Sequence, residues 1–290
     1  MRRILTKALF LALLTSILTV NAKAGDELYF VTYSHDMEEW GSLEISPNVI
    51  WGAPRVANRF LANWTELEYG AKGWWTVELY LDSQKTLHDS ALLTGWRWEN
   101  RFRPLAGEHK INPVLYVEYE DISDADKAIK EVVGFDSKFD LVASNADLRT
   151  SRNHEIETKL ILGSNFRGWN VSENFVFEKN LNNNPWEFGY AAGVSRPLRL
   201  AATGRNCRWC RENFQAGWEF YGGLGTRYDF TLRDTSHYAA PVLAWSAGNS
   251  VTLRISPTFG ITRSSIPFMV RFGVSYEVPR FNRQVRRWLR

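Results

Sequence analysis

Charged side chains recur at every second position within otherwise apolar runs of this 290-residue sequence. Glu118 and Glu120, for example, alternate with Val117 and Tyr119. An extended strand turns successive side chains to opposite faces, so the two carboxylates would share one face. Fourteen acids and six bases follow this pattern. The acids are Glu44, Glu66, Glu68, Glu78, Asp82, Glu99, Glu118, Glu120, Glu155, Glu157, Glu178, Glu187, Glu219 and Glu277. The bases are Arg97, Arg101, Arg103, Lys159, Arg254 and Arg271.

Two kinds of chemistry are open to such a charged face. Arg–Glu pairs could cross-link a narrow interior and largely fill it. Alternatively, the surplus of carboxylates could line a water-filled path that prefers cations. Trp64 and Tyr116 lie on the same face as the acids, so they are the candidates for contact with a solute. Both interpretations of the charges stay open.

Little in the sequence predicts catalysis, a cofactor or a metal. The five histidines form no zinc-protease or Ser–His pattern. They are His35, His88, His109, His154 and His237. Five aspartates between Asp121 and Asp140 lie among three lysines. Their spacing is not that of an EF-hand, which favours a solvated loop over a calcium site. We therefore expect no enzyme, no cofactor and no metal.

Cys207 and Cys210 are the only cysteines. An oxidising compartment favours a disulfide between them, which would rigidify one turn. A redox motif would need a βαβ context, and a metal site would need further ligands. We predict a local disulfide.

The first 24 residues have the pattern of a secretory signal. A basic start precedes an uncharged run over residues 8–20, which is shorter than the roughly 20 residues of a membrane-spanning helix. Residues 22–24 form a small-x-small cleavage site. Without this segment, 31 basic residues stand against 32 acidic ones. The basic pI therefore does not predict nucleic-acid binding.

Twelve segments of alternating polarity would carry the charges. Their spans are 40–50, 58–70, 73–83, 89–103, 109–121, 153–165, 168–180, 185–197, 211–225, 236–246, 249–261 and 265–278. Membrane strands need about 9–11 residues, whereas strands of soluble sandwiches cluster near 5–6. We predict an all-β fold, a transmembrane antiparallel up-and-down β-barrel of about 12 strands. Residues 28–33 are either an extra strand or an N-terminal plug.

A lipid-exposed strand must have every backbone group paired, which requires closure into a barrel. One face then meets lipid, where an Arg or Lys near the midplane costs about 2–4 kcal/mol. The strand charges should therefore face the lumen, and Glu173 is the main exception. Most of the 13 Trp residues are expected to form aromatic girdles at the membrane interfaces rather than sugar-stacking platforms.

The connections fit a barrel whose N-terminus lies in the periplasm. Short turns then lie on the periplasmic side, and the longest connection, 121–153, lies outside. A short helix is predicted to begin at 123–126 and to pack through apolar residues as far as Val133. The loop that holds Cys207 and Cys210 falls on the periplasmic side although it is long.

The last segment contains Arg271-x-Gly273-x-x-Tyr276-x-Val278, which resembles the C-terminal β-signal of Gram-negative outer-membrane proteins. The resemblance implies insertion by the outer-membrane assembly machinery through these four residues. The chain departs from the pattern because an Arg-rich tail continues for twelve residues past Val278. The strand could end at Val278 or at Phe281, and the tail could rest near anionic headgroups or in the periplasm.

At the level of class, residues 40–281 are similar to small 12-stranded outer-membrane channels and putative transporters. We therefore expect four parts along the chain: a signal peptide (1–24), an N-terminal segment (25–39), a barrel (40–281) and a basic tail (282–290). We expect a monomer in the outer membrane, with the lipid bilayer and the assembly machinery as partners and no nucleic acid.

The favoured function is a narrow channel or transporter for a small polar or cationic solute. One alternative is a closed structural or surface-binding barrel that uses the 121–153 loop. Another is a soluble secreted β-sandwich or sugar-binding protein.

Overall fold

The computed structural model describes residues 28–128, 132–135, 141–182, 184–201, 207–248 and 250–288. The predicted signal segment, 1–24, lies outside these ranges. The strands are β1 (Leu43–Ala53), β2 (Phe60–Lys72), β3 (Trp75–Thr86), β4 (Ala91–Phe102), β5 (Asn112–Ser123), β6 (Arg152–Phe166), β7 (Trp169–Asn180), β8 (Trp186–Pro197), β9 (Phe214–Thr226), β10 (His237–Ser246), β11 (Val251–Gly260) and β12 (Phe268–Val278). The helical elements are α3 (Asn145–Leu148), the 3-10 turn η1 (Arg211–Asn213) and α4 (Phe281–Trp288).

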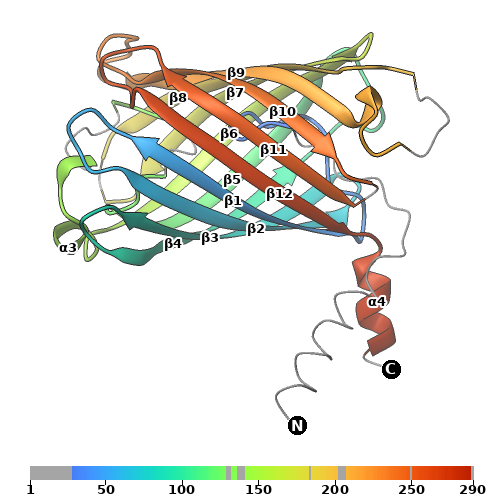
Figure 1. The fold of residues 1–290 in the computed structure, drawn as a ribbon, viewed down its shortest axis with the longest axis horizontal. Coiled ribbons are helices and arrows are strands. Elements are labelled where there is room, and N and C mark those ends of the chain that lie inside the picture. The colour runs from blue at the N-terminus through green and yellow to red at the C-terminus, as the bar shows by residue number, and fades with distance from the viewer. Residues whose placement is uncertain are drawn as a thin grey trace.

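Each strand pairs antiparallel with its neighbours in sequence, and β12 pairs back with β1, so the sheet is a closed barrel (Figure 1). The closing pair runs from Leu43 opposite Val278 to Ala53 opposite Phe268. Closure leaves no strand edge unpaired, as a lipid environment demands. The predicted fold class, an up-and-down antiparallel barrel of about 12 strands, is confirmed.

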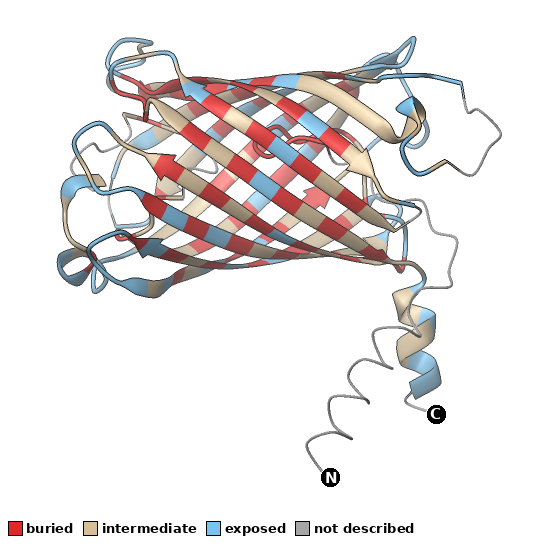
Figure 2. Ribbon diagram, in the orientation of Figure 1, coloured by how far each residue is buried: buried red, intermediate tan, exposed pale blue. Residues whose placement is uncertain are grey.

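Buried and exposed residues alternate along the strands and form bands around the wall (Figure 2). Large apolar side chains stand exposed on the outside. Among them are Leu79, Leu81, Trp98, Leu115 and Phe272. A closed barrel that turns such a surface outward needs lipid around it, which indicates a membrane protein. None of the helices in the described ranges has the length and apolarity to cross a bilayer.

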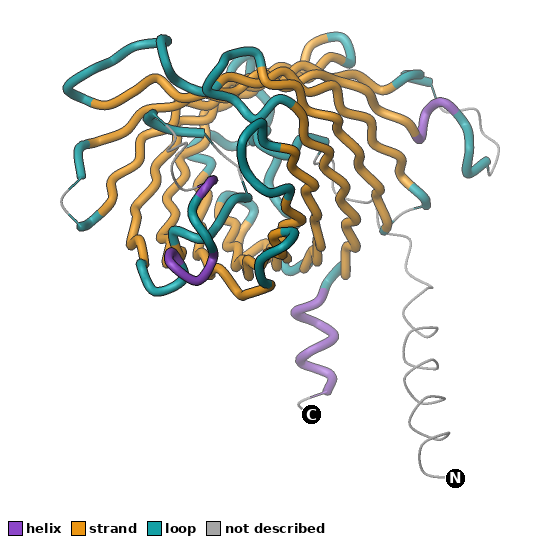
Figure 3. Tube along the Cα trace, turned by 60° about the vertical axis from the view of Figure 1, so that its left-hand side comes forward, coloured by secondary structure: helices purple, strands orange, loops and turns teal. Residues whose placement is uncertain are grey.

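The N-terminal segment occupies the inside of the barrel. Residues 28–35 form no strand. All eight are buried, so side chains on either side of the segment are covered by other residues. A strand of the wall would expose every second residue, so the burial places this segment in the lumen. Of the two predicted alternatives for residues 28–33, the plug describes the structure. We call residues 28–39 the plug; Figure 3 shows loop segments running inside the barrel.

A second segment enters the barrel from the opposite end. The connection between β5 and β6 carries Ala125, Lys127 and Val132, all of which are buried. The Gln84 side chain donates to the carbonyl of Ala125 and accepts from the backbone N–H of Lys127 at 2.7 Å. We call the described residues 124–128 and 132–135 the inner loop.

The predicted helix at the start of this connection is wrong in position. The described residues 124–128 and 132–135 are not helical, and Ile129, which the prediction also used, lies outside the described residues. The backbone instead bonds to wall side chains such as Gln84, which replace the intrahelical bonds. Within the described part of this connection, α3 is a helix that begins after Ser144, whose side chain caps the N–H of Asp147 at 3.2 Å.

Strand β12 ends at Val278, and the chain then turns into α4 at Phe281. The four residues of the predicted β-signal therefore all lie on the strand that closes the barrel. Arg271 is buried inside, whereas Tyr276 is half-buried on the opposite face. Gly273 leaves no room for a side chain, because a Cβ there would overlap Asn48.

An arginine on the lipid-facing wall should impair folding in the membrane. Leu79→Arg in β3 should cost about 2–4 kcal/mol, because the guanidinium enters hydrocarbon. The matched control is Val56→Arg, at a position that is 82% exposed in the β1–β2 connection. Heat-modifiable gel mobility of membrane fractions would measure the folded share. Equal folding of both variants would contradict a lipid-facing Leu79.

Candidate functional site

The predicted charged residues lie on the inner wall of the barrel. Those that are buried are Glu44, Glu66, Glu68, Glu78, Asp82, Arg97, Glu99, Arg101, Glu118, Glu120, Glu157, Lys159, Glu219, Arg254, Arg271 and Glu277. Glu155, Glu178 and Glu187 are half-buried on the same face. Arg103 lies just past the end of β4, where it contacts Glu108 at 3.5 Å. Glu173 is exposed on the outer face of β7.

One group of wall charges is balanced by arginine. Arg101 forms ion pairs with Glu68 and Glu78 and lies 3.2 Å from Glu99. The strands bring these residues together because Glu68, Glu78 and Glu99 occupy matching register positions on β2, β3 and β4. We call these four residues the Arg101 cluster. The three carboxylates can be buried because the guanidinium that they share neutralises part of their charge.

A second arginine joins β3, β4 and β5. The Arg97 guanidinium binds both oxygens of the Asp82 carboxylate at 3.1 Å and lies 3.4 Å from Glu118. It also lies over the Tyr80 ring, 4.3 Å from the centroid. A bidentate geometry of this kind is stronger and more directional than a single contact.

Carboxylates dominate the wall from β5 to β8. Glu118 faces Glu157, Glu157 faces Glu178, and Glu178 faces Glu187 in the register of successive strands. Glu120 faces Glu155 in the next row. We call these six residues the acidic patch. Two cations contact it: the Arg97 guanidinium lies 3.4 Å from Glu118, and Nζ of Lys159 lies 2.8 Å from Glu157.

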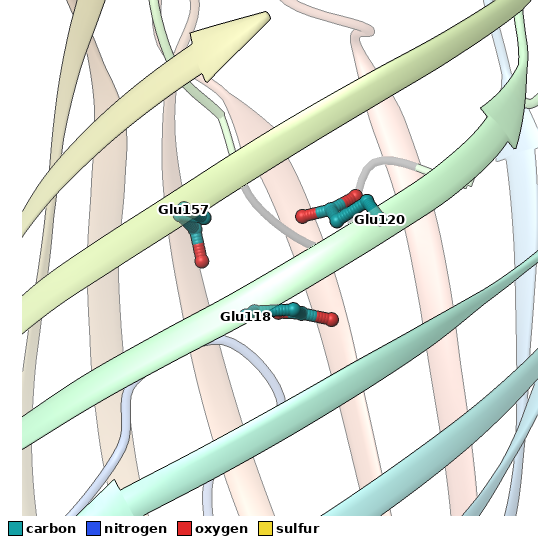
Figure 4. Close-up of side chains that lie close together, drawn as sticks. All are labelled: Glu118, Glu120 and Glu157. Carbon is teal, nitrogen blue, oxygen red and sulfur yellow. The ribbon is translucent and has the colours of Figure 1, made fainter. Parts of the chain in front are cut away.

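Three members of the acidic patch approach one another closely. Oxygens of Glu118, Glu120 and Glu157 all lie within 4.8 Å of one another. Figure 4 shows the first two on one strand and Glu157 on its neighbour. Hard oxygen donors suit a hard cation such as Ca²⁺ or Mg²⁺, so this is where the interior would attract one.

The wall holds the plug through its backbone. Oε1 of Glu219 accepts the backbone N–H groups of Phe30, Val31 and Thr32 at 3.1, 2.8 and 2.8 Å. Arg254 donates to the carbonyl of Tyr29 at 3.0 Å. These contacts satisfy backbone groups that no strand ladder pairs.

The side-chain amide of Asn174 on the wall also binds the backbone of the plug. Asn174 accepts the N–H of Tyr33 at 2.6 Å and donates to the carbonyl of the same residue at 2.9 Å. Sequence reasoning missed Asn174, because an uncharged residue among alternating positions gives no signal of its own. Its partner lies 141 residues away in the chain.

The tip of the plug lies against the charged wall. The Tyr33 hydroxyl donates to Glu99 at 2.9 Å, and its ring lies edge-on to Tyr116 with centroids 5.1 Å apart. Lys159 Nζ lies 4.4 Å from the centre of the Tyr33 ring. The two candidate solute contacts also lie here. Tyr116 contacts the plug in this way, and Trp64 is buried and donates to Glu66 at 2.6 Å.

The plug leaves little open space in the middle of the barrel. A cavity of about 10 Å³ lies between plug residues 29–33 and wall residues that include Trp64, Glu66 and Arg254. That volume admits about one water molecule. Near the barrel end where β1 begins, a larger cavity of about 250 Å³ is lined by Tyr29, Asp36 and several wall residues. Plug residues 29–33 therefore pack closely against the wall in this part of the lumen.

The inner loop narrows the opposite end. Gly134 is packed against the carboxylate of Glu187, which is a member of the acidic patch. Gly134 also forms a β-bridge with Gly225 on β9. Lys127 Nζ donates to the carbonyl of Ala143 at 3.2 Å. The alternating pattern of the strands could not predict that this segment enters the barrel, because the segment lies in the connection between β5 and β6.

Cys207 and Cys210 are joined by a disulfide in the connection between β8 and β9. Trp209 within it stacks on Trp245 with ring centroids 4.1 Å apart. Of the histidines, His35 in the plug is buried and contacts Glu108 at 3.1 Å. His237 bonds to Thr235 at 2.9 Å.

The comparisons with solved structures agree with this architecture. The KdgM porin matches at a TM-score of 0.51 and 8% identity, over 80% of this chain and 98% of the porin. An outer-membrane channel from Pseudomonas putida F1 matches at 0.53 and 9%, over 84% and 97%. This chain has the fold of outer-membrane channels. LpxR from Salmonella typhimurium also matches at 8% identity, over 81% and 99%, but its TM-score of 0.43 is too low to support an argument.

The sequence itself matches no protein-family model and no curated protein. The predicted resemblance is therefore confirmed at the level of class, with no specific family. At identities below 10% the likeness concerns the fold. The solute and the chemistry of the outer-membrane barrel have to be argued from its own residues.

Removing the shared cation of the Arg101 cluster should destabilise the barrel. Arg101→Met takes away the partner of three buried carboxylates, which should cost about 3–5 kcal/mol. Arg55→Met, in the exposed β1–β2 connection, is the control and should cost little. Urea unfolding in lipid vesicles would measure both. A loss for Arg101→Met no larger than for the control would argue against the cluster as a stabilising unit.

Ionisation of Asp126 in the inner loop should weaken the fold. Burial raises the pKa of Asp126 to about 6, and the negative charge of Asp82 acts in the same direction. The folded protein therefore holds this proton more tightly than the unfolded chain does. Its stability should fall as the pH rises from 3.8, the ordinary value, through 6.

Asp126→Asn tests this dependence, since the amide oxygen can still accept the N–H of Ala128, now at 2.6 Å. At a pH above 7, the variant should unfold at a higher temperature than the parent. Near pH 4, the two midpoint temperatures should differ little. Asp229→Asn, at an exposed position, serves as the control. A variant that is less stable than the parent above pH 7 would show that the charge is not the cost.

Proposed function

We propose that this protein is a narrow outer-membrane channel for a small polar or cationic solute, closed by its own plug. The observation that carries the proposal is the acidic patch, in a lumen whose centre is filled by the N-terminal segment. Six carboxylates point inward from β5 to β8, and Lys159 is the base on the same inner face of these strands. Such a surplus of negative charge raises the local concentration of cations.

The plug is suited to a closed state that can open. Its residues are covalently continuous with β1 but form no strand of the barrel. The wall binds its backbone through side chains such as Glu219 and Asn174. Withdrawal would return these groups to water, where they are well solvated, and would leave the wall ladder intact.

We further propose that the chain inserts as a monomer through its β-signal, with the end where β1 begins and β12 ends in the periplasm. A closed barrel has all its strand edges paired internally, so it needs no second copy to complete the sheet. The β-signal residues Arg271, Gly273, Tyr276 and Val278 all lie on β12. We propose no enzymatic role and no cofactor.

Deletion of the plug should open the channel. The chain without residues 28–39 should show a steady ohmic conductance in planar bilayers, while the full chain should conduct little. The reason is that the central cavity beside the plug holds about one water molecule. Heat-modifiable mobility would verify that both proteins are folded. A folded deletion variant that stays silent at both polarities would favour the permanently closed, structural barrel instead.

The opened channel should prefer cations because of the acidic patch. In the plug-deleted background, Glu118→Gln, Glu120→Gln and Glu157→Gln together should reduce that preference, measured as the reversal potential in a salt gradient. Glu173→Gln is the matched control, because this acid lies on the outer face. An unchanged reversal potential in the triple variant would exclude the patch as the source of selectivity.

A further inference from the structure

Helix α4 carries a concentrated positive charge just outside the barrel. It follows β12 after two residues and contains Arg283, Arg286 and Arg287, all exposed, with no acidic residue. Arg280 precedes it. Exposed arginines at this density, with no acid among them, attract anionic groups.

The remaining side chains give α4 an apolar side. Phe281, Val285 and Trp288 are spaced by four and three residues, which places them along one face of a helix. None of the three is buried, and Trp288 is 80% exposed. A short helix with arginines on one side and an aromatic–aliphatic face on the other has the pattern of an interfacial membrane helix.

The direction of α4 agrees with that pattern. In Figures 1 and 3 the helix runs away from the barrel, across the barrel axis rather than along it. The barrel axis is the direction that crosses the bilayer, so α4 extends roughly parallel to the membrane surface.

Hydrogen bonds fix this direction. The backbone N–H of Asn282 donates to the carbonyl of Gly41 at 3.1 Å, and that of Arg280 donates to the Ser42 hydroxyl at 3.2 Å. The Asn282 side chain packs against Gly41, where a Cβ would not fit. Trp40, which is 62% exposed, precedes these residues and adds a second indole at the same level. Tryptophan is typical of the membrane interface.

We propose that α4 is a binding surface for the anionic phospholipid headgroups of the leaflet that surrounds its end of the barrel. The three arginines bind the phosphate groups, and Phe281, Val285 and Trp288 enter the upper part of the acyl region. The lipid surface supplies both the negative charge and the apolar contact that the two sides of the helix require.

An environment-sensitive fluorophore on Val285→Cys tests this in the full chain. The native cysteines form a disulfide, so the new thiol is the labelled one. The protein is inserted into vesicles of phosphatidylcholine alone or of equal parts phosphatidylcholine and phosphatidylglycerol. With phosphatidylglycerol, the emission should shift to the blue and be quenched by spin-labelled lipid. High salt should reduce the shift, since it screens the arginines.

The comparison variant is Arg283→Gln, Arg286→Gln and Arg287→Gln together, which should lose the shift that depends on phosphatidylglycerol. Its matched control replaces Arg227, Arg233 and Arg263, exposed at the opposite end of the barrel, and should keep it. A label that stays in water with phosphatidylglycerol would overturn the proposal. So would a shift that is equal in both lipids or that survives in the α4 triple variant.

Discussion

A peptide backbone in lipid has no water to bond with, so every N–H and C=O in the membrane must find a partner within the protein. The pairing of β12 with β1 meets that demand here by closing the sheet. Closure divides the side chains of each strand into two sets, because successive residues point to opposite faces. The outer set has to be apolar, and the charged residues are thereby confined to the inside.

The interior then has its own constraint, since charges away from bulk water need counter-charges or solvent. The counter-charges are distributed unevenly over the wall. Arg101 pairs with Glu68, Glu78 and Glu99 on β2 to β4. Arg97 pairs with Asp82 on β3 and with Glu118 on β5. The inner face of the strands from β5 to β8 carries six acids and one base, Lys159. This imbalance is the observation on which the proposed preference for cations rests.

The fold was predictable because a period of two is a strong signal when it recurs over twelve segments. The ladder confirms the alternation; for example, Glu118 lies opposite Glu157 and both point inward. The interior beyond the wall was less predictable. The sequence pattern of residues 28–33 does not distinguish a plug from a further strand. The wall residues that bind this segment are distant in sequence: Asn174 lies 141 residues from its partner, and Glu219 lies 187–189 residues from its partners.

The helix predicted near residue 123 failed for a related reason. Ser123 and its neighbours carry a capping pattern, but local propensity gives way when tertiary partners bind the backbone. Gln84 binds residues 125 and 127 and draws the chain into the barrel. Such a contact between β3 and a distant loop is invisible to any local pattern.

The chemistry of the plug contacts bears on whether the barrel can open. In the closed state, Oε1 of Glu219 accepts three backbone N–H groups, and Asn174 takes the place of a strand partner for Tyr33. If the plug withdrew, water would enter the passage and hydrate the same carboxylate and amide. Bonds are then exchanged rather than lost, and the net value of each exchanged bond is about 0.5–1.5 kcal/mol. The main cost of opening is the exposure of apolar plug residues such as Leu28 and Val31, which an external ligand or lipid contact could offset. A lumen that is polar on its wall and apolar in its plug therefore favours closure without making it permanent.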